Sequence, residues 1–189
     1  MNELISIEPM PVVREGDARP TVAEIWKWLG DVPDPEIPVV SVVDLGIVRD
    51  VAWGDDAVVV TVTPTYSGCP ATEVISQEIR KELIRRGVAR VELRVQLSPA
   101  WTTDWLTEKA KRNLKEYGIA PPTERALGQG NALAASLLAL GQGAAKAELE
   151  CPRCGSANNE MISQFGSTPC KSLHRCLDCR EPFDHFKCH

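Results

Sequence analysis

Hydrophobic side chains recur at helical spacing in three segments of the chain, and each segment carries end signals typical of a helix. The predicted helices cover residues 22–29, 71–86 and about 107–117. Thr21 and Glu24 match a capping box at the first helix, in which each side chain bonds the backbone amide of the other residue. Gly87 and Gly118 follow the second and third helices, where glycine commonly closes a helix.

Three other segments have the composition or the period of β-strands. Residues 39–51 and 57–63 are rich in β-branched side chains, and Gly54-Asp55-Asp56 predicts a turn between them, so we expect a hairpin. Residues 91–97 alternate hydrophobic and polar side chains, as a half-buried strand does. Residues 31–38 contain three prolines, which exclude a helix and predict a stiff loop.

The order of these elements predicts an α+β fold. A helix, two strands, a helix, a strand and a helix follow one another, and the strand–helix–strand portion should form a right-handed parallel crossover. The hairpin adds an antiparallel neighbour. The expected result is a two-layer α/β domain with a small mixed sheet and helices mainly on one face.

Changes in composition divide the chain into four parts. The predicted parts are an N-terminal tail (1–19), the α/β domain (20–122), a Gly/Ala/Leu-rich stretch (123–150) and a cysteine-rich domain (151–189). We interpret the third part as a flexible linker, with a short helix over 131–140 as the alternative. The last part is too small to bury a sufficient core, so we expect it to need a metal to fold.

Charge and hydropathy argue against two classes of partner. Of 189 residues, 26 are Asp or Glu and 21 are Lys or Arg, and a net charge of −5 argues against nonspecific nucleic-acid binding. The longest weakly charged apolar stretch, residues 132–140, is shorter than the ~20 residues of a membrane span. Residues 1–10 lack the features of a secretion signal, so we expect a cytoplasmic protein with reduced thiols.

Six of the seven cysteines lie in residues 151–189. Cys151 and Cys154 form one Cys-x-x-Cys knuckle, and Cys176 and Cys179 form another. Two such knuckles supply the four thiolates of a structural zinc site. Because four protein ligands leave no open position, the zinc is expected to hold a zinc-ribbon domain together rather than to catalyse a reaction.

The other metal-binding side chains of this segment leave several interpretations open. Cys170, Cys188 and His185 are candidates for an additional metal site able to accept iron or an iron-sulfur cluster. A spare thiol could also replace one of the knuckle ligands, or could be a buried packing residue. The sequence does not decide among these interpretations.

Cys69 is a second candidate site, because it lies immediately before Pro70 at the start of the second helix. The free amides and positive dipole end of a helix favour a thiolate, which can bind a metal or attack an electrophile. Burial as a small hydrophobic residue is the alternative. Asp34, Glu36 and Asp44 could line the same depression or cap turns, so we include them in a candidate reactive or transient metal-binding site.

The sequence lacks the common catalytic motifs. It has no Gly-x-Ser-x-Gly, phosphate loop or dinucleotide fingerprint, and its three histidines all lie in residues 151–189, which disfavours a Cys-His hydrolase at Cys69. Trp101 and Trp105 flank a short polar segment. Core packing is their default role, and a partner-binding surface is the alternative, because tryptophan is frequent in interface hot spots.

Several motifs together carry a family resemblance. Residues 34–48 (DPEIPVVSVVDLGIV) and 63–70 (TPTYSGCP) resemble the α/β domain of iron-sulfur assembly factors of the SufT type. Residues 99–105 (PAWTTDW) and 165–188 extend the resemblance to the D subunits, also called J subunits, of bacterial phenylacetyl-CoA epoxidases. Residue by residue, the reactive cysteine of the family falls on Cys69.

This resemblance implies a non-catalytic accessory or maturation role in phenylacetate catabolism, assisting iron or iron-sulfur assembly in a multicomponent di-iron oxygenase. It implies zinc in the ribbon and the oxygenase and reductase subunits as partners, while a homo-oligomer stays open. The absence of Glu-x-x-His pairs agrees with a chain that does not itself hold the di-iron centre. The main alternative is a structural or electron-transfer component that stays bound in the oxygenase complex. A weaker one is a thiol oxidoreductase using a Cys-x-x-Cys pair.

Overall fold

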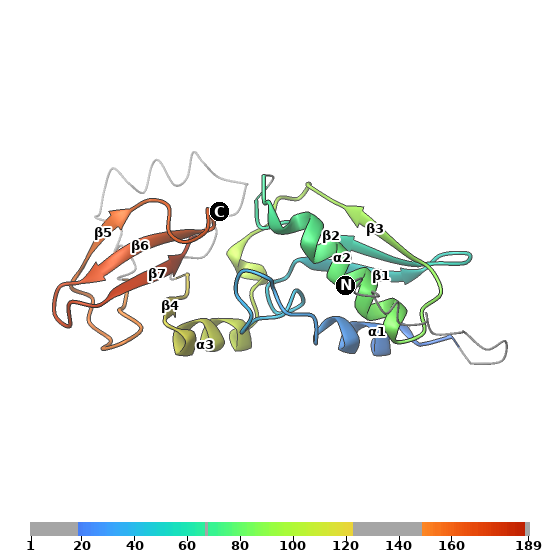
Figure 1. Cartoon of the computed structure of the whole chain (residues 1–189), viewed down its shortest axis with the longest axis horizontal. Coiled ribbons are helices and arrows are strands. Elements are labelled where there is room, and N and C mark those ends of the chain that lie inside the picture. The colour runs from blue at the N-terminus through green and yellow to red at the C-terminus, as the bar shows by residue number, and fades with distance from the viewer. Residues whose placement is uncertain (1–18, 67, 123–148, 188–189) are drawn as a thin grey trace, which may run out of the picture.

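The computed structural model describes residues 19–66, 68–122 and 149–187. Figure 1 shows two lobes side by side along the long axis of the molecule, with helix α3 (Glu108–Tyr117) and strand β4 (Ile119–Ala120) lying between them. The predicted N-terminal tail, the linker with its alternative helix at 131–140, and Cys188 lie outside the described residues, apart from the tail's last residue and the linker's last two.

The larger lobe has the predicted order of elements. Its elements are α1 (Val22–Leu29), β1 (Val48–Trp53), β2 (Val58–Val62), α2 (Ala71–Arg85), β3 (Val91–Val95), the 3-10 helix η1 (Thr103–Trp105) and α3. The sheet order is β1-β2-β3, with β1 antiparallel and β3 parallel to β2. Helices α1 and α2 pack against each other and against the outer strands β1 and β3, respectively. This confirms the predicted mixed sheet and two-layer α+β architecture.

The helix ends follow the predicted signals. The Thr21 hydroxyl accepts a hydrogen bond from the Glu24 amide, and the Glu24 carboxylate accepts one from the Thr21 amide, so the capping box is present. Gly118 closes α3 with a left-handed backbone (φ 96°). Each cap satisfies backbone groups that the helix itself leaves unpaired.

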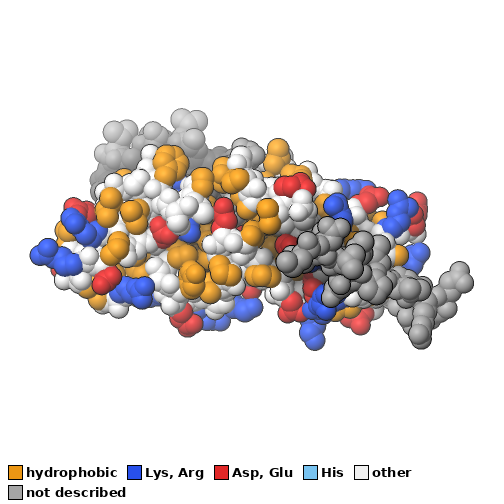
Figure 2. Space-filling model, viewed as in Figure 1, with side chains coloured by type: hydrophobic (Ala, Val, Ile, Leu, Met, Phe, Trp, Pro, Cys, Tyr) orange, Lys and Arg blue, Asp and Glu red, His pale blue; other side chains and the backbone are white. Residues whose placement is uncertain are grey.

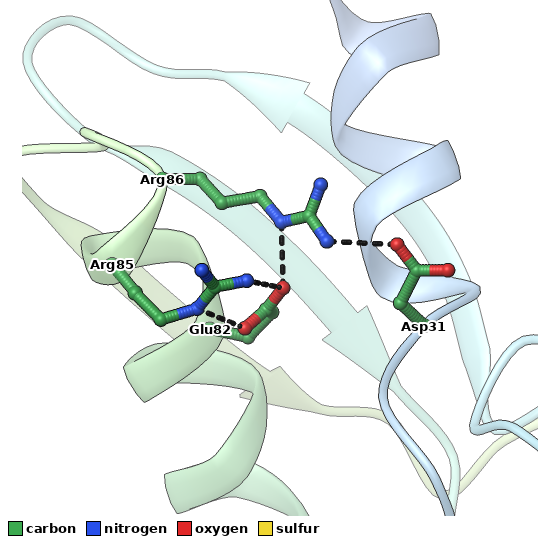
Figure 3. Close-up of polar contacts among 4 residues, drawn as sticks. All are labelled: Asp31, Glu82, Arg85 and Arg86. Atoms are coloured by element: carbon green, nitrogen blue, oxygen red, sulfur yellow. Dashed lines mark hydrogen bonds and ion pairs between the residues drawn. The ribbon is translucent and has the colours of Figure 1, made fainter.

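An ionic network joins the end of α1 to the end of α2 (Figure 3). The Glu82 carboxylate accepts hydrogen bonds from Arg85 Nε at 2.8 Å and Arg86 Nε at 2.6 Å, and Arg86 Nη2 lies 2.7 Å from Asp31 Oδ2. The hydrogen bonds from Arg85 and Arg86 hold the pKa of Glu82 below its usual value. Arg85 and Asp31 are exposed whereas Arg86 and Glu82 are partly buried, so the pairs with an exposed partner contribute at most about 1 kcal/mol each.

The predicted strand at residues 39–51 begins only at Val48. Residues 34–47 instead form consecutive turns, because side-chain oxygens capture backbone amides: Asp34 Oδ1 accepts from Ile37 at 2.8 Å, and Ser41 Oγ accepts from Asp44 at 3.0 Å. Val40, Val42, Leu45 and Ile47 of this segment are nonetheless buried. The β-branched content predicted a strand here, but the local hydrogen bonds decided against extension.

The smaller lobe, residues 149–187, is called the ribbon lobe below. Its strands are β5 (Asn159–Ser163), β6 (Lys171–Cys176) and β7 (Pro182–Phe186). The sheet order is β4-β7-β6-β5, with β4 parallel to β7. Strand β4 directly follows α3, so the larger lobe contributes one strand to the sheet of the ribbon lobe. Only two residues long, β4 carries no pattern by which the sequence could have predicted it.

The two lobes share one hydrophobic core. Cys170 and Phe186 of the ribbon lobe are 5% and 1% exposed and belong to the buried cluster of the larger lobe. Phe186 meets the edge of the Trp101 ring at a centroid distance of 5.9 Å, and Trp101 Nε1 donates to the Leu45 carbonyl at 2.9 Å. Figure 2 shows charged side chains gathered at both ends of the molecule, with hydrophobic ones over the ribbon lobe and the middle.

Gly46 is the tightest point between the turns at 34–47 and η1. It has a left-handed backbone (φ +68°), and a Cβ placed there would lie 2.6 Å from Trp105 Cβ and 2.7 Å from its carbonyl oxygen. Gly46→Ala should therefore lower the free energy of unfolding by about 2 to 5 kcal/mol, combining a left-handed alanine with overpacking. Gly87→Ala is the matched control, because Gly87 has φ +94° but no heavy atom within 4 Å of the added Cβ. If urea denaturation shows equal losses of unfolding free energy for the two variants, the close contact with Trp105 is not the cause.

Candidate functional site

The two predicted cysteine knuckles meet at one point of the ribbon lobe. The Sγ atoms of Cys151, Cys154, Cys176 and Cys179 all lie within 4.8 Å of one another. Cys151 and Cys179 are separated by 3.8 Å and Cys154 and Cys176 by 3.6 Å, sulfur to sulfur. A tetrahedral ion with bonds of about 2.3 Å spaces its sulfur ligands at about 3.8 Å, so the residues fit a four-thiolate metal centre.

The two cysteines of the second knuckle have opposite pKa shifts. The Cys179 amide donates to Cys176 Sγ at 3.5 Å, and this hydrogen bond, helped by the Asp178 amide, lowers the pKa of Cys176 to about 7. Burial and the neighbouring thiols raise the pKa of Cys179 to about 12. Cys151 and Cys176 are fully buried, whereas Cys154 is exposed. A bound divalent ion would offset half of the charge of four thiolates, and these four donors would leave it no open position.

A second group of predicted residues surrounds a small cavity at the junction of the two lobes, which we call the seam pocket. Its polar lining includes Asp34, Glu36, Cys69 and Cys170. Its apolar lining includes Ile37, Leu45, Ile47, Ile75 and Phe186. The cavity volume is about 10 Å³, which is the space of roughly one water molecule.

The four polar side chains reach the seam pocket from three segments of the chain. Asp34 and Glu36 come from the proline-rich loop, where Asp34 Oδ1 accepts hydrogen bonds from the Glu36 and Ile37 amides at 2.9 and 2.8 Å. Cys69 directly precedes the start of α2, and its carbonyl accepts from the Thr72 amide and hydroxyl. Cys170 precedes β6, with its Sγ 3.9 Å from Glu36 Oε2. The loop, a helix start and a strand start thus converge.

The seam pocket favours bound positive charge. Burial raises the pKa of Asp34, and burial together with the Asp34 charge raises that of Glu36. Burial, and then the Glu36 charge, raises the pKa of the Cys170 thiol. Lys171 opposes all three shifts, and its ammonium is itself buried 3.6 Å from Asp184. A cation bound between these groups would relieve their mutual repulsion.

The structure places Asp44 away from the seam pocket. Its carboxylate accepts from the Ser41 hydroxyl at 3.0 Å, the Thr107 hydroxyl at 3.1 Å and the Lys109 ammonium at 2.8 Å. Side-chain hydrogen bonds, led by Lys109, keep the pKa of Asp44 below its usual value despite burial. Asp44 therefore joins the turns at 34–47 to the start of α3.

Three other predicted residues also lie outside the pocket. Trp101 is 3% exposed, so it packs in the core rather than on a surface, while Trp105 is half-buried beneath the Arg49 guanidinium, 3.4 Å from the ring centroid. His185 of β7 lies next to His174 of β6, and Ser172 Oγ is within 3.4 Å of both imidazoles. Burial lowers the pKa of His185 to about 4.

Sequence reasoning missed two residues near the seam pocket. Lys171 stands next to Cys170 in the sequence, but nothing in its context indicates that its side chain is buried. Tyr66 precedes Cys69, and burial, followed by the charges of Cys69, Glu36 and Cys170, raises the pKa of its phenol. Tyr66 could have been included because it lies in the same TPTYSGCP segment as Cys69. The sequence around Lys171 carries no comparable signal.

Comparisons with known proteins agree with this division into two lobes. Residues 22–95 match a family model described as iron-sulfur cluster assembly protein, and residues 139–187 match one described as PaaD zinc beta ribbon domain. A protein of Escherichia coli (strain K12), described as the putative D subunit of 1,2-phenylacetyl-CoA epoxidase, is 48% identical over 171 residues, 90% of this chain and 95% of that protein. The chain belongs to this family of D subunits.

Other relatives match about half of this chain. An Fe-S protein maturation auxiliary factor of Porphyromonas gingivalis is 38% identical over 50% of this chain and 90% of that protein. A solved structure of a domain of unknown function, DUF59, from Bacillus anthracis is 32% identical over 49% of this chain and 89% of that chain, with a TM-score of 0.46. None of the helices in the described ranges combines the length and hydropathy needed to span a membrane.

Removing the ribbon metal is expected to unfold the ribbon lobe selectively. Structural zinc sites contribute an apparent ~10 to 16 kcal/mol, and the ribbon core itself is small. After chelation, amides of residues 149–187 and of β4 should lose protection in hydrogen exchange, while β1, β2 and β3 keep theirs. Loss of protection in both lobes at the same chelator concentration would show that the larger lobe depends on the metal as well.

Asp34→Asn should stabilise the protein at neutral pH. Burial raises the folded-state pKa of Asp34 above its ordinary 3.8. Folding therefore becomes less favourable as the pH rises from 3.8 through the folded-state pKa, because the buried carboxyl must lose its proton. Asparagine keeps an oxygen for the Glu36 and Ile37 amides but carries no charge. The gain in unfolding free energy should be full at pH 7 and absent below pH 3.8. Asp104→Asn, at an exposed carboxylate, should change little; a destabilised Asp34→Asn at pH 7 would refute the argument.

Proposed function

We propose that this chain is an accessory maturation factor of a phenylacetyl-CoA epoxidase, and that it carries iron, alone or as a cluster, toward the oxygenase. Its membership in the D-subunit family supports the link to that enzyme. The match of its larger lobe to iron-sulfur assembly proteins supports the maturation role. The oxygenase and reductase subunits are the proposed partners, and the cytoplasm, where thiols stay reduced, is the proposed compartment.

The observation that carries this proposal is the seam pocket. Cys69 there shares one small cavity with two carboxylates and a second thiol. Thiolates and carboxylates together suit ferrous iron, which accepts both soft and hard ligands. The cavity has no room for an organic substrate such as an acyl-CoA, so the pocket fits a metal cargo better than catalysis on phenylacetyl-CoA.

The ribbon centre has a different proposed role. Its four thiolates would hold zinc with all positions filled, which suits architecture and excludes a labile cargo. The same closed arrangement disfavours a thiol oxidoreductase, because metal-bound thiolates are protected from exchange. The protein therefore separates a permanent metal from a transferable one.

Cys69→Ser should leave a folded protein that no longer supports the epoxidase. Expressed with the epoxidase subunits in cells lacking the native chain, the variant should lower the iron content of the purified oxygenase several-fold. Val74→Ala, at a 44% exposed position of α2 outside the pocket, is the control and should preserve full occupancy. An oxygenase fully loaded with iron in cells that contain only Cys69→Ser would refute the proposal.

A further inference from the structure

The β6–β7 hairpin connects the metal centre of the ribbon lobe to the seam pocket. Cys176 ends β6 and Cys179 lies in the turn that follows, so both ligands lie at the turn end of the hairpin. At the open end, Lys171 pairs with Phe186 and the Lys187 amide donates to the Cys170 carbonyl at 3.0 Å. In Figure 1 the turn lies at the far end of the ribbon lobe and the open end faces the larger lobe.

This connection gives the ribbon lobe a direct share in the cargo site. Cys170 and Phe186 are the ribbon-lobe residues in the lining of the seam pocket, and both stand at the open end of the hairpin. Cys170 is 5% exposed and its thiol points at Glu36. A lobe that served only as a docking surface would not need a buried thiol aimed at the carboxylate of the other lobe.

We infer that the seam pocket binds a single thiophilic divalent cation, ferrous iron in the cell, between the thiols of Cys69 and Cys170 and the carboxylate of Glu36. This inference rests on the proposed function and specifies its cargo and ligands. Asp34 is a positioning residue, because one of its oxygens is used by the Glu36 and Ile37 amides and so orients the loop that carries Glu36. Two lobes thus share one site.

The size and donor set of the pocket favour one ion over an iron-sulfur cluster. A volume of about 10 Å³ accommodates one atom or water, whereas a cluster contains at least two irons and their sulfides. Clusters are usually held by four cysteines, or by two with two histidines. Within the described lining of the pocket the thiols are two, and no histidine accompanies them.

The spacing of the donors suits a site that releases its ion. Among the described residues, the ribbon cysteines are the one group of three or more donors with all their ligand atoms within 4.8 Å. The seam donors are therefore more widely spaced than those of the closed ribbon site. Binding must draw them together, and that rearrangement weakens affinity relative to a preformed cage. Weak binding is what a carrier requires.

Cobalt binding by the full chain tests this site. Protein loaded with one equivalent of zinc is titrated anaerobically with Co²⁺, whose charge-transfer absorption reports cobalt–thiolate bonds, and retained zinc is measured by elemental analysis. One Co²⁺ per chain should bind without displacing zinc. Cys69→Ser and Cys170→Ser should each weaken Co²⁺ binding at least about tenfold, because even substitutions of residues that only contact metal ligands cost this much affinity. The double variant should lose the charge-transfer absorption.

Glu36→Gln separates the carboxylate from the thiols. It should weaken Co²⁺ binding while keeping the thiolate absorption, whereas the control Glu73→Gln, at an exposed position of α2, should change neither. If Cys170→Ser loses its zinc or its fold, Glu36→Gln carries the test, and unchanged affinity in that variant overturns the shared site.

The outcomes distinguish this inference from the proposed function. Unchanged cobalt affinity and absorption in Cys170→Ser would overturn the shared site, even if Cys69→Ser still lowered oxygenase iron in cells and so supported the proposed function. Binding of two irons with sulfide after anaerobic reconstitution would overturn the single-ion assignment. An iron-loaded oxygenase in cells with Cys69→Ser would instead refute the proposed function, on which the assignment of iron as cargo rests.

Discussion

The four-thiolate centre of the ribbon lobe is the interaction on which the rest of the arrangement depends. Residues 149–187 bury few large side chains of their own, and the cluster around Cys151 and Cys176 adds little more than Ala120 and Phe183. Metal–thiolate bonds worth an apparent ~10 to 16 kcal/mol match or exceed the 5 to 15 kcal/mol that stabilise a typical domain. The hairpin that these bonds hold places Cys170 and Phe186 against the larger lobe. The ribbon centre, although far from the seam pocket, therefore helps to determine the geometry of that pocket.

The polar lining of the seam pocket costs stability in the free protein. Asp34 and Cys170 are almost fully buried, so the loss of water disfavours their charged forms, and the Glu36 charge disfavours the thiolate of Cys170 further. Lys171 offsets part of this repulsion but is held by Asp184 as well. Apolar neighbours such as Ile37 and Phe186 lower the local dielectric, which strengthens the attraction of the same groups for a cation. These groups would therefore gain from the cation that we propose for this pocket.

The loop at residues 34–47 supports both lobes although it has almost no regular secondary structure. Its hydrophobic residues fill the core beneath β1, while Asp34, Ser41 and Asp44 use their oxygens to satisfy backbone amides or to bind α3. The Leu45 carbonyl accepts from Trp101, which in turn contacts Phe186 of the ribbon lobe. A loop with satisfied polar groups can be buried, and here it forms one wall of the seam pocket.

The sequence by itself determined the three α-helices and the three strands of the larger lobe, although not where the first strand begins, together with the mixed sheet, the capping box and the two knuckles. Each of these depends on residues close together in the chain or on a fixed spacing. It also placed Cys69 with Asp34, Glu36 and Asp44 in one candidate site and indicated Cys170 separately. Only the tertiary structure decided which of them meet: it brought Cys170 to Glu36 across 134 positions of sequence, directed Asp44 to Lys109 and buried Trp101. Such pairings follow from how the lobes pack, and in particular from β4 joining β7, an association of two short segments for which local sequence carries no signal.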